Sequence, residues 1–339
     1  MRAPRLGETG VESLRTQWEA ACSRSPALRF VDIGLRGFGQ VMFQDNPLTG
    51  LLFLAAIAWG SIVAGVPHVL LAGVLGAVAS TLTAVWLNAD KTALMAGLYG
   101  YNGVLVGLAL ATFLAQGVAL WIYVALGAAV STVATLGTTN ALKPFGAPAL
   151  TAPFVGVTWI MLLATYGFAG LSGAALPAAG VVAPFEPAAA VSVGLGAYLA
   201  GTLLSISQVF LKASVVSALL LLVGLAVSSV PAALFALGGA MLAVAVAHAF
   251  GAESDLVTQG LLGFSPVLTA IALGVTFRRP SLKTTLYAAL AVIFTVVAQA
   301  ALNVALRPFA LPALTAPFVL VSWMFLLPGE ESKTSSKPE

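Results

Sequence analysis

Two threonines, Thr151 and Thr315, occupy the same place in a segment that the chain contains twice. The segment "LKPFGAPALTAPFVGVTWIMLL" at 142–163 returns as "LRPFALPALTAPFVLVSWMFLL" at 306–327. A threonine hydroxyl donates and accepts hydrogen bonds without carrying charge. Two equivalent hydroxyls could therefore bind a neutral polar solute.

Prolines flank both threonines. Pro148 and Pro312 stop any helix that arrives from before them, and Pro153 and Pro317 suit the first turn of a new helix. We therefore predict a break in each copy. Irregular backbone survives at membrane depth only against protein or a cavity, and broken helices form solute sites near the membrane midplane. The alternative is that each threonine merely caps the last helix of its half.

The composition places these breaks in a membrane protein. Of 339 residues, 60% are hydrophobic and 8% are charged, and the mean hydropathy is +1.01. A helix needs about 20 apolar residues to cross the hydrocarbon layer, where every backbone polar group must be paired internally. Charge-free runs of about that length occur at 48–65, 67–87, 118–136, 215–230, 234–250 and 285–302. The sequence predicts an all-α polytopic membrane protein.

The repetition extends well beyond the threonine segments. "GLYGYNGVL" at 97–105 matches "GLLGFSPVL" at 260–268, and "GQVMFQDNPLTGLLFL" from Gly39 matches "SQVFLKASVVSALLLL" from Ser207. Three blocks in one order at a nearly constant offset indicate two homologous halves. The predicted division is a tail at 1–27, a first repeat at 28–167, a linker at 168–195, a second repeat at 196–328 and a polar tail at 329–339.

The predicted topology gives each half five membrane spans and one re-entrant pore helix. The short apolar pieces near 102–115 and 265–277 are assigned as re-entrant because of their length. Five is odd, so the second half is inverted relative to the first. Most lysines and arginines then fall on the side of the two termini, while the linker carries none. The positive-inside rule predicts cytoplasmic termini and an external linker. We also expect an inner-membrane location.

The duplicated "LPxLTxPF…W" block, "GLYGYNGVLVGLAL" at 97–110 and "GQVMFQDNPLTGLLFLAAI" at 39–57 together resemble the urea transporter family. The resemblance covers about residues 30–327. It implies ten spans with two re-entrant pore helices, a pore through each protomer of a homotrimer, and passive, channel-like flow of urea.

The resemblance also implies which residues line the pore. The family's filter threonines match Thr151 and Thr315, and its polar position before valine matches Gln40 and Gln208. Its aromatic slot is matched in part, because Leu211 stands where the first half has Phe43. The slot residues and the leucines opposite them are Phe43, Tyr101, Leu105, Leu211, Phe264 and Leu268.

These residue types suit urea, which is planar and neutral and carries four N–H donors and one acceptor. A donor left unpaired in a dry pore costs roughly 1–3 kcal/mol, so the path needs a column of neutral acceptors. Flat apolar rings admit a planar molecule and disfavour hydrated ions.

The remaining residues weigh against other classes of protein. Acids and histidines lie near predicted span ends, and no metal-ligand cluster, phosphate loop or nucleophile–base pair is present. We therefore expect no enzyme activity, no cofactor and no nucleic-acid partner. An ion-coupled transporter, or a passive pore for another small solute such as a short amide or ammonia, is the alternative. Arg36, within the first predicted span, has no assigned role.

Overall fold

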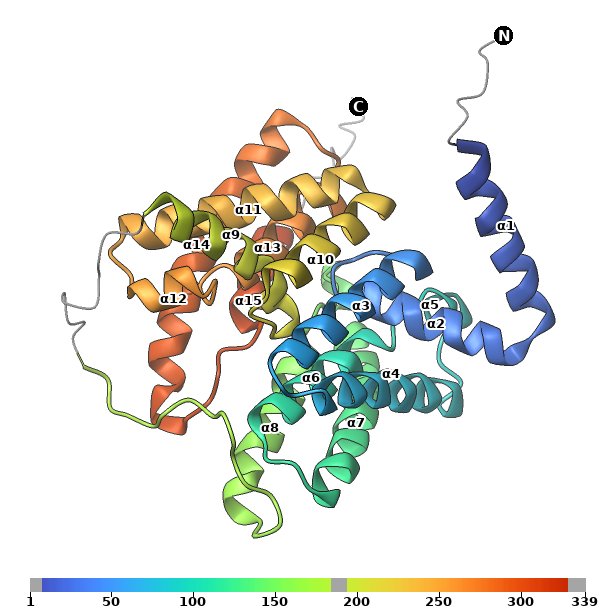
Figure 1. Ribbon diagram of the computed structural model, residues 1–339, viewed down its shortest axis with the longest axis horizontal. Coiled ribbons are helices and arrows are strands. Elements are labelled where there is room, and N and C mark those ends of the chain that lie inside the picture. Colours follow the sequence, from blue (N-terminus) through green and yellow to red (C-terminus); the bar gives the residue numbers. More distant parts are fainter. Residues whose placement is uncertain (1–7, 184–193, 329–339) are drawn as a thin grey trace, which may run out of the picture.

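The computed structural model describes residues 8–183 and 194–328, and these residues form a bundle of helices (Figure 1). Within them the only β contact is an isolated bridge between Leu114 and Gly173. The first helices are α1 Glu8–Arg24, α2 Pro26–Gln40, α3 Pro47–Val63, α4 His68–Trp86, α5 Lys91–Met95, α6 Tyr101–Phe113, α7 Val118–Leu142 and α8 Ala152–Ala164. They are followed by α9 Leu195–Ser207, α10 Val215–Ser228, α11 Val230–Ala249, α12 Ser254–Thr258, α13 Phe264–Ile271, α14 Leu282–Leu306 and α15 Ala316–Leu326.

The all-helical prediction is confirmed for the described residues. Among them, α4, α7, α11 and α14 are each long and apolar enough to cross a membrane alone, and α9 with α10 forms a pair bent by 73°. The predicted N-terminal tail is described from Glu8 as α1, which stands apart from the bundle in Figure 1. The predicted C-terminal tail at 329–339 and part of the predicted linker, 184–193, lie outside the described residues.

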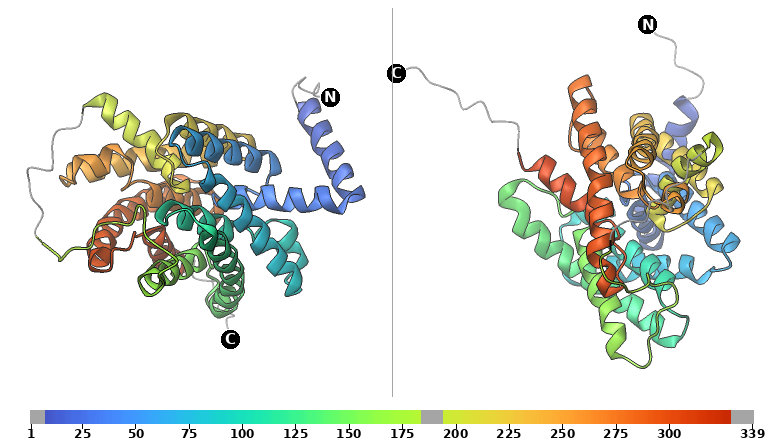
Figure 2. Two further views of the ribbon diagram at one scale, coloured as in Figure 1. Left: turned by 60° about the horizontal axis from the view of Figure 1, so that its bottom comes forward. Right: turned by 90° about the vertical axis from the view of Figure 1, so that its left-hand side faces the viewer.

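Helices of matching length recur in the same order along the two parts of the chain. α7 and α14 are both 25 residues long, and α5 and α12 are both five. The two parts lie side by side, the first coloured blue to green and the second yellow to red (Figures 1 and 2). Left-handed backbone also recurs at matching positions, at Phe43 and Leu211 and again at Leu150 and Leu314.

Helix α6 runs antiparallel to both of its neighbours. Its first turn meets the far part of α7, where Asn102 donates to Thr135 Oγ1 (3.0 Å). Its last turn meets the start of α4, where His68 Nε2 lies 3.1 Å from the Ala111 carbonyl oxygen. α4 and α7 therefore begin at the same end of the bundle. If both cross the membrane, the chain must return between them, and α6 makes that return.

This order favours a crossing helix over the re-entrant piece predicted for residues 102–115, and the same holds for 265–277. Ser265 and Thr269 of α13 contact Gln299 (2.8 Å) and Thr295 (3.0 Å) of α14, again in antiparallel order. The re-entrant assignment depended on length, because α6 spans only about 20 Å at 1.5 Å per residue. Ten of its thirteen residues are buried, so it lies inside the bundle.

Glycines allow α4 and α6 to approach closely. A Cβ on Gly76 would lie 2.1 Å from the Gly103 carbonyl oxygen, and a Cβ on Gly107 would lie 2.1 Å from that of Ala72. Gly103 and Gly107 are the G-x-x-x-G pair of this helix. Small residues at such an interface let backbones pack when lipid supplies no hydrophobic drive.

Arg36 has two carboxylate partners in the structure. Its Nε lies 2.9 Å from Asp32 Oδ2 and one guanidinium nitrogen lies 2.5 Å from Asp45 Oδ1. The buried Asp32 also accepts a hydrogen bond from Trp18 Nε1 of α1 (2.7 Å). Arg36 thus ties α2 to the segment before α3, and Asp32 holds α1 against α2.

Candidate functional site

The predicted breaks are present in both copies of the repeated segment. α7 ends at Leu142, Pro148 lies in the irregular stretch, and α8 begins at Ala152 with proline in its first turn. Leu150 and Leu314 precede the two threonines with φ of 51° each. Left-handed backbone is costly for a leucine, so the surrounding packing must impose it.

Thr151 and Thr315 meet at the centre of the site. Their hydroxyl oxygens are 2.7 Å apart, and each residue is 3% exposed. Both occupy the residue before the first helical turn, yet neither side chain makes a capping hydrogen bond. The capping interpretation is therefore wrong. In the pair one hydroxyl donates and the other accepts, which leaves one O–H and spare lone pairs for a third group.

Two tryptophans bind the opposite break reciprocally. Trp159 Nε1 donates to the Pro312 carbonyl (2.9 Å), and Trp323 Nε1 donates to the Pro148 carbonyl (2.8 Å). These two carbonyls are occupied, because the tryptophans hold the two breaks together.

A second reciprocal pair joins α3 to α10. Thr49 Oγ1 donates to the Gly224 carbonyl (2.8 Å), and Ser217 Oγ donates to the Ala56 carbonyl (2.7 Å). Thr49 and Ser217 are equivalent in the repeat, as are Ala56 and Gly224. Contacts that exchange partners in this way are those of a two-fold relationship.

Tyr101 and Asn102 brace the first break. Tyr101 Oη donates to the Leu150 carbonyl (2.5 Å), and Asn102 Nδ2 approaches the same oxygen (3.5 Å). Asn102 Oδ1 accepts from the Phe154 backbone N–H (3.2 Å). Sequence reasoning missed Asn102. The signal was present, since the second half has Ser265 there, which reaches its own break at 3.5 Å from the Leu314 carbonyl.

Gln40 and Gln208 are oriented alike. Gln40 Nε2 donates to the Ala96 carbonyl (2.9 Å), and Gln208 Nε2 donates to the Gln259 carbonyl (3.1 Å). A carbonyl partner requires the amide nitrogen on that side. Each Oε1 then points elsewhere and receives no protein hydrogen bond within the described chain, so both are available as neutral acceptors.

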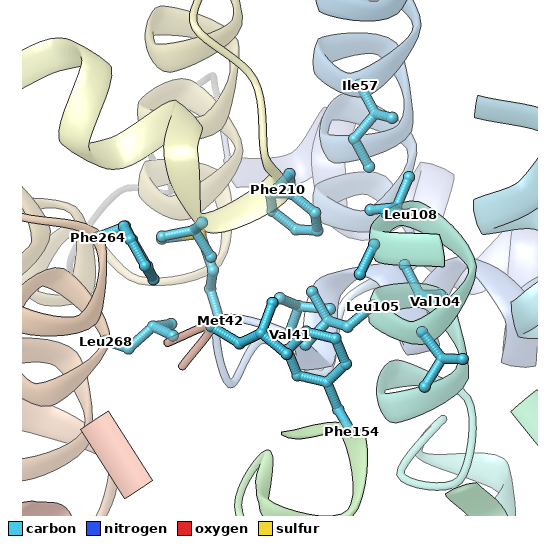
Figure 3. Close-up of a cluster of buried hydrophobic side chains, with 14 of the residues drawn as sticks. Val41, Met42, Ile57, Val104, Leu105, Leu108, Phe154, Phe210, Phe264 and Leu268 are labelled. Carbon is cyan, nitrogen blue, oxygen red and sulfur yellow. The ribbon is translucent and has the colours of Figure 1, made fainter. Parts of the chain in front are cut away.

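The apolar residues of the predicted slot gather in one cluster. In Figure 3, Phe264 and Leu268 of α13 lie on one side, Leu105 of α6 lies on the other, and Met42 lies between them. Tyr101, Phe43 and Leu211 pack against this cluster.

Phe43 also makes aromatic contacts that the sequence analysis did not foresee. Its ring centroid lies 5.7 Å from that of Phe277 and 6.1 Å from that of Phe318, both edge-on. Phe318 is the phenylalanine of the second "LTAPF" copy, so the repeat itself was the available signal.

The site is closed at the threonines. A cavity of about 670 Å³ opens beside Leu211, and another of about 390 Å³ lies by Phe235, but neither is lined by Thr151 or Thr315. At that level the two hydroxyls bond directly to each other.

Comparison with known proteins identifies relatives along most of the chain. A family model described as "Urea transporter" matches residues 31–330. "Urea transporter 1" of Ovis aries is 30% identical over 313 residues, covering 89% of this chain and 77% of that protein. "Urea transporter 1" of Capra hircus is 30% identical over 316 residues with the same coverage, and that of Rattus norvegicus is 30% identical over 312 residues.

Proposed function

The chain belongs to the urea transporter family, and on that premise we propose that it conducts urea passively through a path within each protomer. It is a multi-pass membrane transporter and not an enzyme. The observation that carries the proposal is the buried contact between Thr151 and Thr315, two neutral hydroxyls brought together from distant parts of the chain.

The threonine pair is the narrow point of the proposed path. A passing urea replaces the 2.7 Å hydrogen bond between the hydroxyls with its own bonds to them. One urea N–H donates to a hydroxyl oxygen, and the free O–H donates to the urea carbonyl. One hydrogen bond between the hydroxyls is lost and two to urea are gained, which offsets part of the hydrogen bonding to water that urea gives up on entering.

The amide oxygens of Gln40 and Gln208 supply further acceptors on the same path. Both are neutral, which suits rapid exchange of a solute that carries no charge. The rings of Phe43 and Phe264 and the leucines opposite them strip water and favour a flat molecule. Hydrated ions find no charge to compensate their lost water.

Two inverted halves position these groups. The reciprocal bonds of Trp159 with Trp323, and of Thr49 with Ser217, support a two-fold axis between the halves. The α3–α10 contacts run in antiparallel order, as an axis in the membrane plane requires. With α6 and α13 crossing, five spans per half leave one re-entrant helix in each. We assign α9, which is bent by 73° against α10, and its equivalent α2.

This topology keeps both termini on one side and the linker on the other. Lys91 then lies on the same side of the membrane as the termini, and Lys212 lies on the same side as the linker. The excess of positive charge still lies with the termini, which supports cytoplasmic ends; the inner-membrane location is part of the proposal. We also retain the homotrimer as a proposal.

Stopped-flow light scattering on proteoliposomes tests the function. The purified chain should accelerate volume recovery after an inward urea gradient, compared with empty liposomes. Parallel runs with acetamide and with ammonia test the alternative solutes. Faster recovery with either of these, and none with urea, would assign another small solute to the path.

A further inference from the structure

The cavity of about 670 Å³ lies where four parts of the chain meet. These are the turn between α3 and α4, the end of α6, the break between α9 and α10, and residues 174–175. Its polar lining includes Lys212, His68 and Gln116, and its lining residues include no aspartate or glutamate.

Lys212 is a buried cation without a protein partner at its charged end. The residue is 4% exposed, and no hydrogen bond or ion pair to Nζ is found within the described chain. Its aliphatic part lies against Gly60, where an added Cβ would meet Lys212 Cβ at 3.0 Å and Cδ at 3.1 Å. The stem is thus confined, and Lys212 is one of the residues that line the cavity. Burying an unpaired charge is unfavourable unless a counter-charge joins it.

The other polar residues of the cavity do not neutralise this cation. His68 Nδ1 lies 2.6 Å from Gln116 Nε2, and His68 Nε2 lies 3.1 Å from the Ala111 carbonyl. Both contacts of His68 are to neutral groups, so they supply no negative charge to Lys212.

Comparison of the two repeats shows that only the second half carries a cation at this position. Gln44 is the equivalent of Lys212 in the first half. It is also buried, but its Nε2 donates to the Met42 carbonyl (2.7 Å). In the first half, a neutral side chain with a hydrogen-bond partner therefore occupies the equivalent position. The fold does not require the charge of Lys212.

We propose that this cavity is a binding site for a small anion, with Lys212 as its cation. A water occupies about 30 Å³ of liquid volume, so the cavity can hold an anion of chloride to carboxylate size with several waters. Because helix ends surround the cavity, the anionic group could come from solution or from a lipid headgroup. Both sources present the same chemistry to Lys212.

Thermal unfolding of the full chain in detergent tests the site. The probes are chloride, exchanged for gluconate at constant ionic strength, and phosphatidylglycerol, exchanged for phosphatidylcholine in mixed micelles. At ten times its dissociation constant, a bound anion should raise the unfolding midpoint by roughly 2–4 °C. Lys212→Gln should abolish the rise, whereas Lys212→Arg and the exposed control Lys143→Gln should retain it.

A chloride response identifies a dissolved anion, and a response to phosphatidylglycerol alone identifies a headgroup; each supports the site if it depends on Lys212. An unchanged wild-type midpoint with both probes, or a full rise in Lys212→Gln, overturns it. If Lys212→Gln does not fold, amine labelling of the wild type decides. Chloride or phosphatidylglycerol should slow labelling of Lys212 and not of Lys143, and equal rates with both probes reject the site.

Discussion

Replacing both central threonines with valine, Thr151→Val with Thr315→Val, removes the two hydroxyls and keeps the side-chain shape. The hydroxyls are partners of each other at 2.7 Å. Removing both members of a hydrogen-bonded pair in favour of apolar groups of the same shape is nearly neutral for stability. The double variant should therefore fold, with an unfolding midpoint close to that of the wild type.

Urea should lose its partners at this point of the path. Each urea N–H left without an acceptor in a dry site costs about 1–3 kcal/mol. Because 1.4 kcal/mol corresponds to a factor of ten in rate, loss of one such contact slows urea about 5- to 150-fold. We expect a decrease near the middle of that range in the stopped-flow rate of urea-driven volume recovery, at equal reconstituted protein.

The two helices that follow the threonines, α8 and α15, provide a matched control. Thr158 and Ser322 are equivalent in the repeat, and their hydroxyls are buried without a partner. Thr158→Val with Ser322→Ala removes the same number of hydroxyls from α8 and α15, and urea flux should stay at the wild-type rate. A folded Thr151→Val, Thr315→Val protein with wild-type flux would refute the role of the threonine pair.

Three further predictions concern packing and the second acceptor. The double variant Trp159→Phe, Trp323→Phe leaves the two carbonyls at the breaks without donors, at a cost of about 1–3 kcal/mol each. The thermal unfolding midpoint in detergent should therefore fall by several degrees. An unchanged midpoint would show that these hydrogen bonds do not hold the breaks together. Gly76→Ala places a Cβ 2.1 Å from a carbonyl oxygen of α6 and should prevent recovery of folded protein by size-exclusion chromatography. Gly156→Ala meets nothing within 4 Å and should be tolerated or stabilise by about 0.5–1 kcal/mol; equal yields of the two variants would contradict the close approach. Gln208→Leu removes a neutral acceptor and should slow urea about tenfold in the proteoliposome assay, whereas wild-type flux would exclude its oxygen from the path.

The features that sequence predicted best depend on local chemistry. Proline ends helices wherever it lies in them, so the breaks before Thr151 and Thr315 could be placed from the sequence. The internal repeat then made the two threonines equivalent, which led to the expectation that both serve one solute site. Composition alone was enough to assign a helical membrane protein.

The features that sequence could not supply depend on contacts between distant segments. Trp159 and Trp323 gave no sign that they bind the opposite break, because that requires the relative placement of the two halves. α6 was assigned as re-entrant because it is short, whereas its antiparallel contacts with α4 and α7, which favour a crossing, are visible only in the structure. The partners of Arg36, likewise, are visible only once α2 and the start of α3 are in place.

The central claim is passive conduction of urea, and uptake of labelled urea into proteoliposomes tests it most directly. With identical ions and pH on both sides, urea should enter rapidly and stop at equal inside and outside concentrations. An imposed proton or sodium gradient should change neither the rate nor this end point. Uptake that requires such a gradient, or that accumulates urea above the outside concentration, would contradict the account and favour an ion-coupled transporter.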